Sequence, residues 1–356
     1  MPSHLPTTMD EAAQRLREEA FQAEPGQDFT IRGFQPEDAW GVARCFYEVY
    51  AEHYPFDTYY VPPKLIEANR QGDMISAVAC TERGDIVAFG SLFRNFSQNP
   101  RLYETGQASV IPSYRGTLAV LCLQEHLFNE VGAELAIDAI FGEPVCNHRV
   151  MQRVSAVFGF VETGIELGLM PGETYRKGDA AGGRVSTLLA FKVLRDSPRE
   201  LYLPREYETV LGGLLGNLPL TRNAQISTAP FPETGSSDLE VRCFAPMQAL
   251  RIFACGLGRD FAKRLADELA RAASQGVEVL QVMVNLGEPW AGRGVEELRR
   301  QGFFFGGLLP QWYGTDGLLM QKLAFAPDFG SLELETPASR ELLAFIREDQ
   351  AGLGRD

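Results

Sequence analysis

The chain of 356 residues has few of the side chains that usually bind metals in proteins. It contains only four histidines, no His-x-x-x-His pair and no Cys-x-x-Cys pair. Its six cysteines stand apart in the sequence, and most have apolar neighbours, as buried free thiols do. We therefore expect no metal site, no disulfide framework and a reducing compartment.

Positive charge and long apolar runs are also scarce. The 33 Lys and Arg residues face 47 Asp and Glu residues, which gives a formal net charge of −14. Because an acidic surface repels phosphate backbones and anionic lipids, nucleic acid and membranes are poor partners. No apolar run approaches membrane-spanning length, and the first residues lack a signal-peptide pattern. We expect a cytoplasmic protein that binds neither nucleic acid nor membrane.

The composition is that of a globular protein, and the length predicts more than one domain. Hydrophobic residues make up 45% of the chain and charged residues 22%. The predicted segments are a helical extension at 1–27, a first domain at 28–196, a helix and linker at 197–237, a shorter second domain at 238–326, and a tail with a short helix at 327–356.

Strand and helix patterns are interleaved in the first domain. Strands are expected at 29–32, 74–80, 86–93, 102–111, 135–141, 160–169 and 184–194, and helices at 36–50, 63–70, 117–131 and 147–158. This order predicts an α/β fold of the layered α+β kind, in which helices flank a mixed twisted sheet.

The second domain repeats part of this order. Strands are expected at 239–244, 277–284, 302–309 and 318–325, and helices at 257–274 and 290–300. The order matches residues 102–194, so we predict a shortened second copy. Gly256 and Gly258 precede the first of these helices, but a third glycine and a suitably spaced acid are missing, which makes a Rossmann dinucleotide site improbable.

Two motifs in the first domain carry a family resemblance. Residues 110–116 read V-I-P-S-Y-R-G, which resembles the end of the fourth strand and the start of the pyrophosphate loop in the GNAT superfamily of N-acetyltransferases. Asn147, followed twelve residues later by Gly159 and Phe160, resembles the asparagine and the Gly-Phe signature of the fourth helix in that family. The two motifs have the order and spacing of the family.

Further stretches resemble a bacterial branch of the family that carries a second half-domain. In the first domain these are residues 143–152 and 164–168. Residues 302–310 and 319–323 look like the closing strands of the second half-domain. The resemblance implies a GNAT-like sheet followed by a shortened GNAT-like copy.

The resemblance implies that acetyl-CoA (coenzyme A) is the cofactor. A strand that turns into a helix presents unpaired backbone N–H groups to an anion, and the coenzyme A pyrophosphate is such an anion. The residues expected to bind it are Ala108, Val110 and Ile111 on the strand, Arg115, Gly116, Thr117, Leu118, Ala119 and Val120 in the loop and first helical turn, and Asn147 at the fourth helix.

Acyl transfer to an amine needs a base for the amine proton and an acid for the departing thiolate. Glu104 lies on the expected fourth strand, near where the family places its base, although it is equally a surface strand residue. Ser155 stands where the family often has a tyrosine acid. His148 is a second acid–base candidate or a structural histidine at a helix start.

The segment around the first two helices is rich in aromatic residues. They are Tyr47, Tyr50, Tyr54, Phe56, Tyr59 and Tyr60, with His53 among them. In GNAT folds this segment commonly forms one wall of the acceptor pocket, so the residues could select an apolar or aromatic acceptor. A well-filled core beneath a loop explains them equally well.

Two functions from different classes follow. The first is an N-acyltransferase that moves an acetyl group from acetyl-CoA to the amine of a small molecule or a protein, in a direct ternary complex. The acidic surface favours a basic acceptor. The second is a GNAT-like sensor or interaction module without turnover. This reading is favoured by Leu118 and Val120, where the family has a glycine and a small residue, and by Ser155. A regulatory protein partner and a homodimer fit either function.

Overall fold

The computed structural model describes residues 5–19, 21, 23–54, 56–94, 97–172 and 183–353. By their contacts these residues divide into two units. Unit 1 comprises the described residues within 1–95, 103–137 and 172–183, and unit 2 those within 96–102, 138–171 and 184–356. This division differs from the segments 28–196 and 238–326 because the strands and helix between 138 and 193 pack with the second half of the chain. Those segments stay a prediction about the repeat.

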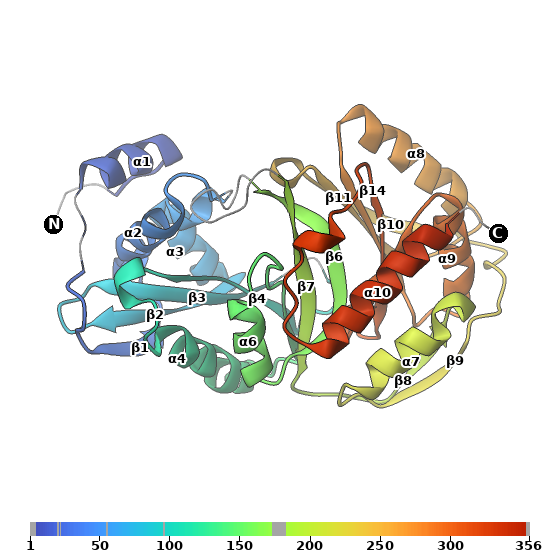
Figure 1. Cartoon of the computed structure of the whole chain (residues 1–356), viewed down its shortest axis with the longest axis horizontal. Helices are drawn as coiled ribbons and strands as arrows, with labels where there is room; N and C mark the ends of the chain where they lie inside the picture. Colours follow the sequence, from blue (N-terminus) through green and yellow to red (C-terminus); the bar gives the residue numbers. More distant parts are fainter. Residues whose placement is uncertain are drawn as a thin grey trace. The chain divides into compact units, whose positions relative to one another are not determined.

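Unit 1 is an antiparallel sheet with helices on both faces, as Figure 1 shows. Its strands lie in the order β1 (Phe29–Gly33), β2 (Met74–Thr81), β3 (Ile86–Arg94) and β4 (Leu102–Val110). Helices α2 (Ala39–Tyr50) and α3 (Pro62–Gln71) cover one face, and α4 (Ala119–Glu125) covers the other. A π-helical turn (His126–Val131) and α5 (Gly132–Glu134) continue from α4. The expected order of one strand, two helices, three strands and a helix is confirmed.

The core of unit 1 follows from the helical spacing of α2. Val42, Ala43 and Phe46 recur on one face of that helix and are fully buried against the sheet. The N-terminal helix α1 (Met9–Glu18) adds buried residues Ala12 and Leu16 to the same cluster. The predicted extension is therefore anchored to unit 1.

Unit 2 is built on a mixed sheet. Its strands are β5 (Ala139–Gly142), β6 (Val161–Pro171), β7 (Arg184–Val193), β10 (Asp238–Phe244), β11 (Ala249–Gly256), β12 (Val279–Asn285), β13 (Phe304–Leu309) and β14 (Gly317–Leu323). They lie in the order β5-β7-β6-β13-β14-β12-β11-β10, with β11 and β12 parallel and the other neighbours antiparallel.

Six strands of unit 2 are arranged symmetrically about one junction. The set β5-β7-β6 faces the set β12-β14-β13, and the two sets meet where Gly164 of β6 pairs with Gly307 of β13. A Cβ atom at Gly164 would lie 2.8 Å from the Gly306 carbonyl oxygen, so this junction requires glycine. The mirrored order confirms a shortened second copy of the first domain's sheet.

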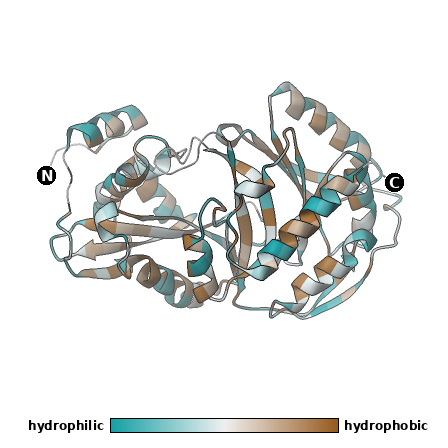
Figure 2. Cartoon of the chain, viewed as in Figure 1, coloured by the Kyte–Doolittle hydropathy of each residue, from teal (hydrophilic) through white to brown (hydrophobic). Residues whose placement is uncertain are grey.

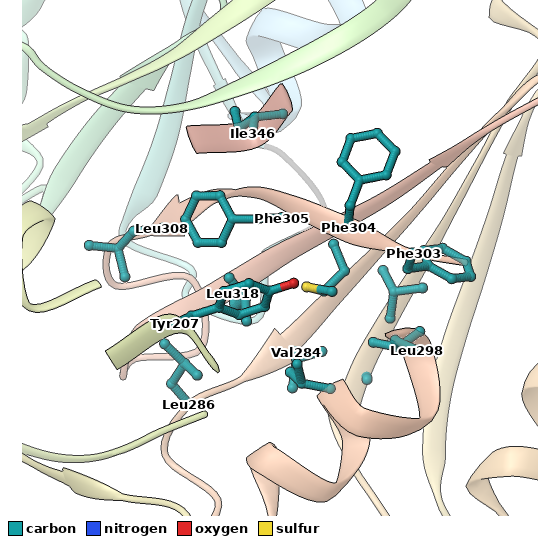
Figure 3. Close-up of a cluster of buried hydrophobic side chains, with 14 of the residues drawn as sticks. Tyr207, Val284, Leu286, Leu298, Phe303, Phe304, Phe305, Leu308, Leu318 and Ile346 are labelled. Atoms are coloured by element: carbon teal, nitrogen blue, oxygen red, sulfur yellow. The ribbon is translucent and has the colours of Figure 1, made fainter. Parts of the chain in front are cut away.

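Four helices pack on one face of this sheet, namely α7 (Glu208–Gly216), α8 (Phe261–Ser274), α9 (Ala291–Arg300) and α10 (Pro337–Gly352). A further helix, α6 (Val150–Val157), precedes β6 in the chain. Figure 3 shows part of the cluster beneath the four helices, in which Phe305 lies near Tyr207 and Phe303 lies near Leu298. Apolar and polar residues are interspersed along α10 in Figure 2, and its apolar residues Leu342 and Ile346 are buried.

Four details differ from the expected elements. Strand β11 was not predicted. Within the predicted linker, residues 222–226 form β9 (Arg222–Ile226), which pairs with β8 (Arg199–Leu203). Helix α6 begins at Val150 rather than at residue 147, since the carbonyl groups of Cys146 and His148 accept from Glu333 N–H and from the Gln152 side chain instead of from helical N–H groups. The tail helix α10 has 16 residues and is not short.

The concave face of the unit 2 sheet encloses a buried polar layer, defined as Glu143, Glu166, Thr187, Arg251 and Gln281. The Arg251 guanidinium donates to Gln281 Oε1 at 2.7 Å and to Glu166 Oε1 at 3.0 Å. In the sheet, β13, β14 and β12 lie between the strands of Glu166 and Arg251, so the sheet must curl until β6 and β11 face each other. Period-two alternation places apolar clusters on either side of this layer.

None of the helices in the described part of the chain is long and apolar enough to cross a membrane.

Candidate functional site

Strand β4 of unit 1 carries a β-bulge. Phe89 pairs with Ser109, but Ser91 pairs with Gly106, so β4 has one residue more than β3 between these pairs. Gln107 lies in the bulge with a φ of 53°, and Ser91 Oγ donates to its Oε1 at 3.2 Å. A bulge bends the strand and re-aims the residues that follow it. Beyond the bulge the pairing with β3 resumes at Ser109 and Val110.

The chain leaves β4 through a short loop before α4. The last ladder bond runs from Ile111 N–H to Val87 O, and Pro112 then ends the strand because it has no N–H group. Gly116 has a φ of 86°, a left-handed conformation that favours glycine. Arg115 and Gly116 are exposed. The loop thus presents backbone and one cation to solvent.

Several backbone N–H groups of this loop have no partner. Thr117 N–H donates to Tyr114 O, and Ala119 N–H donates to Thr117 Oγ1 at 3.3 Å. Within the described residues, the N–H groups of Gly116, Leu118 and Val120 donate no hydrogen bond. Three free donors at the start of a helical segment, beside Arg115, form a site suited to an anion. Five amides were predicted to bind the cofactor, and the geometry leaves these three available.

Leu118 and Val120 occupy the two positions that depart from the family pattern. The side chain of Leu118 is 64% exposed, and that of Val120 is half-buried. Leu118 therefore contributes little to the core of unit 1. An exposed leucine in a loop of otherwise polar and glycine residues is free to contact a bound molecule.

Glu104 lies half-buried on β4, opposite Phe93. Burial and the nearby Glu104 carboxylate both raise the pKa of the Tyr59 phenol, and a hydrogen bond with Ser91 opposes them. Tyr59 in turn stacks on Phe46, with ring centroids 4.5 Å apart. The predicted base therefore stands beside the aromatic segment.

Some residues of the aromatic segment belong to the core of unit 1, and others, here called the rim tyrosines (Tyr50 and Tyr54), are only half-buried. Phe46, Tyr59 and Tyr60 are buried, which fits the core-filling explanation. Tyr50 and Tyr54 are half-buried at the edge. Burial raises the pKa of Tyr50 to about 12, with the Arg115 charge opposing the rise. Tyr50 thus lies within electrostatic reach of Arg115 in the loop.

The remaining predicted site residues belong to unit 2. Asn147 precedes α6, and its Oδ1 atom is buried without a hydrogen-bond partner among the described residues. His148 is exposed, and Ser155 is half-buried within α6. Their roles, like those of Glu104 and the strand residues Ala108, Val110 and Ile111, stay predictions.

Glu143 is a candidate that the sequence did not reveal. It follows β5, and its carboxylate lies 3.4 Å from Arg251 at the edge of the buried polar layer. Burial and the neighbouring Glu166 raise the pKa of Glu143 to about 7, while Arg251 opposes the rise. The sequence marks it only as the first residue of the stretch 143–152. Its chemistry was not predicted, because its neighbours Glu166 and Arg251 lie about 20 and 110 residues away.

The second copy has a loop at the equivalent place, between β11 and α8. There Gly258 N–H donates to Ser237 Oγ at 2.9 Å, and the Asp260 carboxylate accepts from Ser237 N–H at 2.7 Å. A Cβ atom at Gly258 would lie 2.8 Å from the Gly235 carbonyl oxygen. Residues 235–237 therefore close this loop, and Asp260 places a negative charge in it.

No group of three or more His, Cys, Asp or Glu side chains gathers as metal ligands would in the described residues.

Comparisons with known proteins find similarity at the level of solved structures. No family model matches the chain, and no curated protein matches its sequence. A ribosomal-protein-alanine N-acetyltransferase from Brucella melitensis is 18% identical, with a TM-score of 0.39, and the match covers 46% of this chain and 99% of that one.

An N-acetyltransferase from Staphylococcus aureus is 14% identical, with a TM-score of 0.39 and coverages of 47% and 99%. The protein yncA from Salmonella typhimurium, solved with its cofactor acetyl-CoA, is 16% identical, with a TM-score of 0.39 and coverages of 48% and 96%. Each match thus spans about half of this chain and nearly the whole of the other protein.

Proposed function

We propose that this chain is an N-acyltransferase that uses acetyl-CoA and an amine acceptor. The observation that carries the proposal is the loop after the bulged strand β4. It leaves the N–H groups of Gly116, Leu118 and Val120 free beside Arg115, in the sequence context V-I-P-S-Y-R-G. Free amides of this kind fit a pyrophosphate.

By the family resemblance we assign Ala108, Val110 and Ile111 to the pantetheine arm and the loop to the phosphates. The contact of Asn147 with the cofactor, which the resemblance also implies, stays a prediction.

When bound, acetyl-CoA supplies an acyl group activated as a thioester. In the proposed reaction Glu104 accepts the proton that the acceptor amine loses as its nitrogen forms the new bond to the acyl carbon. Ser155 or His148 would donate a proton to the departing sulfur as the carbon–sulfur bond breaks. The rim tyrosines Tyr50 and Tyr54 would line the acceptor side.

The partners proposed are an amine on a small molecule or a protein. The formal charge of −14 steers cations toward the surface, which favours a basic acceptor. A regulatory protein partner and a homodimer stay proposals of the same rank.

The test is calorimetry of the purified protein with acetyl-CoA, with desulfo-CoA and ATP as comparison ligands. We expect micromolar binding of acetyl-CoA and desulfo-CoA and much weaker binding of ATP. Acetyl transfer is then measured against a panel of polyamines, aminoglycosides and lysine peptides. Absence of binding by both coenzyme A ligands would overturn the proposal.

A second function is favoured by one observation. Leu118 and Val120 stand in the loop where the family has a glycine and a small residue, and Leu118 is 64% exposed there. A chain that binds acetyl-CoA without transferring its acetyl group would be a sensor. Binding without turnover, together with unchanged behaviour of a Glu104→Gln variant, would select this function over the enzyme.

A further inference from the structure

Within unit 1, the loop before α4 is tied to the segment that precedes β1. This segment, residues 5–19, 21 and 23–27, is here named the N-terminal extension. The hydroxyl of Tyr114, in the loop, donates a hydrogen bond to the Glu24 carbonyl oxygen at 2.8 Å. The extension therefore contacts the loop to which the proposed function assigns the cofactor phosphates.

Tyr114 is fixed at its side chain and at its backbone. The side chain is buried, and its ring meets that of Phe29 edge to face, with centroids 6.3 Å apart. Its carbonyl oxygen accepts from the N–H group of Thr117 at 3.2 Å and from the Thr117 hydroxyl at 2.8 Å. Arg115 and Gly116 lie between these two residues in the chain. Tyr114 therefore holds both ends of the segment that presents the Arg115 cation and the Gly116 N–H group.

The same contacts continue into the first turn of α4. The Thr117 hydroxyl donates to the Tyr114 carbonyl oxygen and accepts from Ala119 N–H at 3.3 Å. Thr117 thus links the loop to the start of the helix, where the N–H groups of Leu118 and Val120 donate no hydrogen bond within the described residues. A displacement of Tyr114 would therefore move all three of the donors that are proposed to bind the phosphates.

Glu19 holds the extension on the core of unit 1. Its carboxylate accepts hydrogen bonds from Arg15 at 2.6 Å, from Trp40 Nε1 at 2.9 Å and from Arg44. Burial opposes ionisation, but these hydrogen bonds outweigh it and lower the pKa of Glu19 to about 2. The carboxylate is therefore charged near neutral pH. Trp40 and Arg44 belong to α2, so Glu19 fixes the end of α1 to that helix.

Glu24 is held from a second direction. Its carboxylate forms an ion pair with Arg83, in the turn between β2 and β3. The adjacent Ala23 is buried, and Ala12 and Leu16 of α1 pack in the cluster that contains the core residues of α2. The carbonyl oxygen that Tyr114 binds is therefore anchored on both sides by contacts with the rest of unit 1.

We infer that Tyr114 and the N-terminal extension together position the loop before α4 for coenzyme A, so that the extension sets the affinity of unit 1 for the cofactor. Tyr114 is a positioning residue in this scheme, since it acts through the backbone of residues 115–117. A loop held in its binding arrangement before the ligand arrives binds more tightly, because the apparent Kd rises as the competent fraction falls. The inference rests on the proposed function, in which this loop binds the phosphates.

The test is Tyr114→Phe, which keeps the ring and removes only the hydroxyl. Its matched control is Tyr60→Phe. Tyr60 is also a buried tyrosine of unit 1, and its hydroxyl also donates to a backbone carbonyl group, that of Ala51, at 2.8 Å. Calorimetry gives the Kd for acetyl-CoA, and thermal unfolding gives the melting temperature, of each variant of the full chain.

We expect both variants to melt at a lower temperature, since each loses one hydrogen bond. Only Tyr114→Phe should bind acetyl-CoA more weakly, with a Kd that is higher by about fivefold, because fewer molecules hold the loop in its binding arrangement. An unchanged Kd in Tyr114→Phe, or an equal rise in Tyr60→Phe, would overturn the inference. Absence of binding by the unsubstituted protein would overturn the proposed function and this inference together.

A second variant tests the extension itself. Glu19→Gln keeps the side-chain length and removes the negative charge that pairs with Arg15 and Arg44. The loss of a negative charge should by itself strengthen the binding of an anion. We therefore expect a Kd for acetyl-CoA that is higher by about threefold only if the extension positions the loop, and an equal or lower Kd would overturn the inference.

Discussion

The two loops that precede α4 and α8 occupy equivalent places in the two copies and differ in what they leave exposed. The loop of unit 1 has free N–H groups at Gly116, Leu118 and Val120. In the loop of unit 2, Ser237 binds the Gly258 N–H and the Asp260 carboxylate. The comparison teaches that a duplicated domain keeps its strands and helices more readily than its binding groups. The packing of strands and helices depends on many residues, whereas an open anion site depends on only a few.

The largest expected effect comes from placing an acid in each loop. Gly116→Asp should raise the Kd for acetyl-CoA by more than about 100-fold, since like charges in contact cost several kcal/mol. Gly258→Asp should leave that Kd unchanged and destabilise the protein, because a Cβ atom there meets backbone at 2.8 Å. Calorimetry and thermal unfolding measure the two effects.

Gly116→Ala is the control for backbone strain at this position, where φ is 86° and no atom lies within 4 Å of an added Cβ. It should lower stability by about 1 kcal/mol and retain most of the binding. Equal losses of binding in the alanine and aspartate variants would contradict a phosphate contact.

The next largest effect is expected from removing the arginine of each loop, Arg115 before α4 and Arg259 before α8. Arg115→Ala should weaken acetyl-CoA binding about tenfold, and the remaining affinity should depend less on salt, because one cation near the phosphates is gone. Arg259→Ala in the second loop should change neither quantity, since Arg259 is 65% exposed and lies 3.8 Å from Glu233. Calorimetry at two salt concentrations measures this, and similar losses in both variants would break the comparison of the loops.

Unit 2 should also respond to pH through its buried polar layer. The pKa of Glu143 is raised to about 7 in the folded protein, from an ordinary value of 4.5. Between these values the folded state holds more protons than the unfolded state, so the free energy of unfolding falls as the pH rises. We expect a loss of about 1–3 kcal/mol between about pH 5 and about pH 8.

Glu143→Gln should flatten that pH dependence, because the amide stays neutral at every pH. Denaturant unfolding at several pH values measures the slope. A slope as steep as that of the unsubstituted protein would assign the titration to another group.

The smallest effect is expected from opening the second loop. Ser237→Ala removes the hydroxyl that accepts from Gly258 N–H at 2.9 Å and donates to Asp260 at 2.8 Å. Stability should fall by about 1–2 kcal/mol. The number of acetyl-CoA molecules bound should stay the same, because Asp260 still repels an anion. A second bound molecule in calorimetry would show that the hydroxyl alone closes the site.

The sequence by itself determined the elements of unit 1 and the repeat. The 3.6-residue spacing of Val42, Phe46 and their neighbours defines α2, and the motif V-I-P-S-Y-R-G locates the turn at Pro112 and the left-handed Gly116. These signals are local, since they depend on residues a few positions apart. The expected mixed sheet and shortened second copy follow from them and are confirmed.

Only the tertiary structure decided which polar groups have hydrogen-bond partners and which have none. Strand β11 was missed, although it pairs with β12 and carries Arg251, which donates to Glu166 on β6. The sequence marks Gln152 only as the end of the stretch 143–152, yet its side chain donates to the carbonyl oxygen of Glu333, which lies 181 positions away. Such contacts join segments that no local pattern connects, because burial and hydrogen bonding are settled only when distant strands come together.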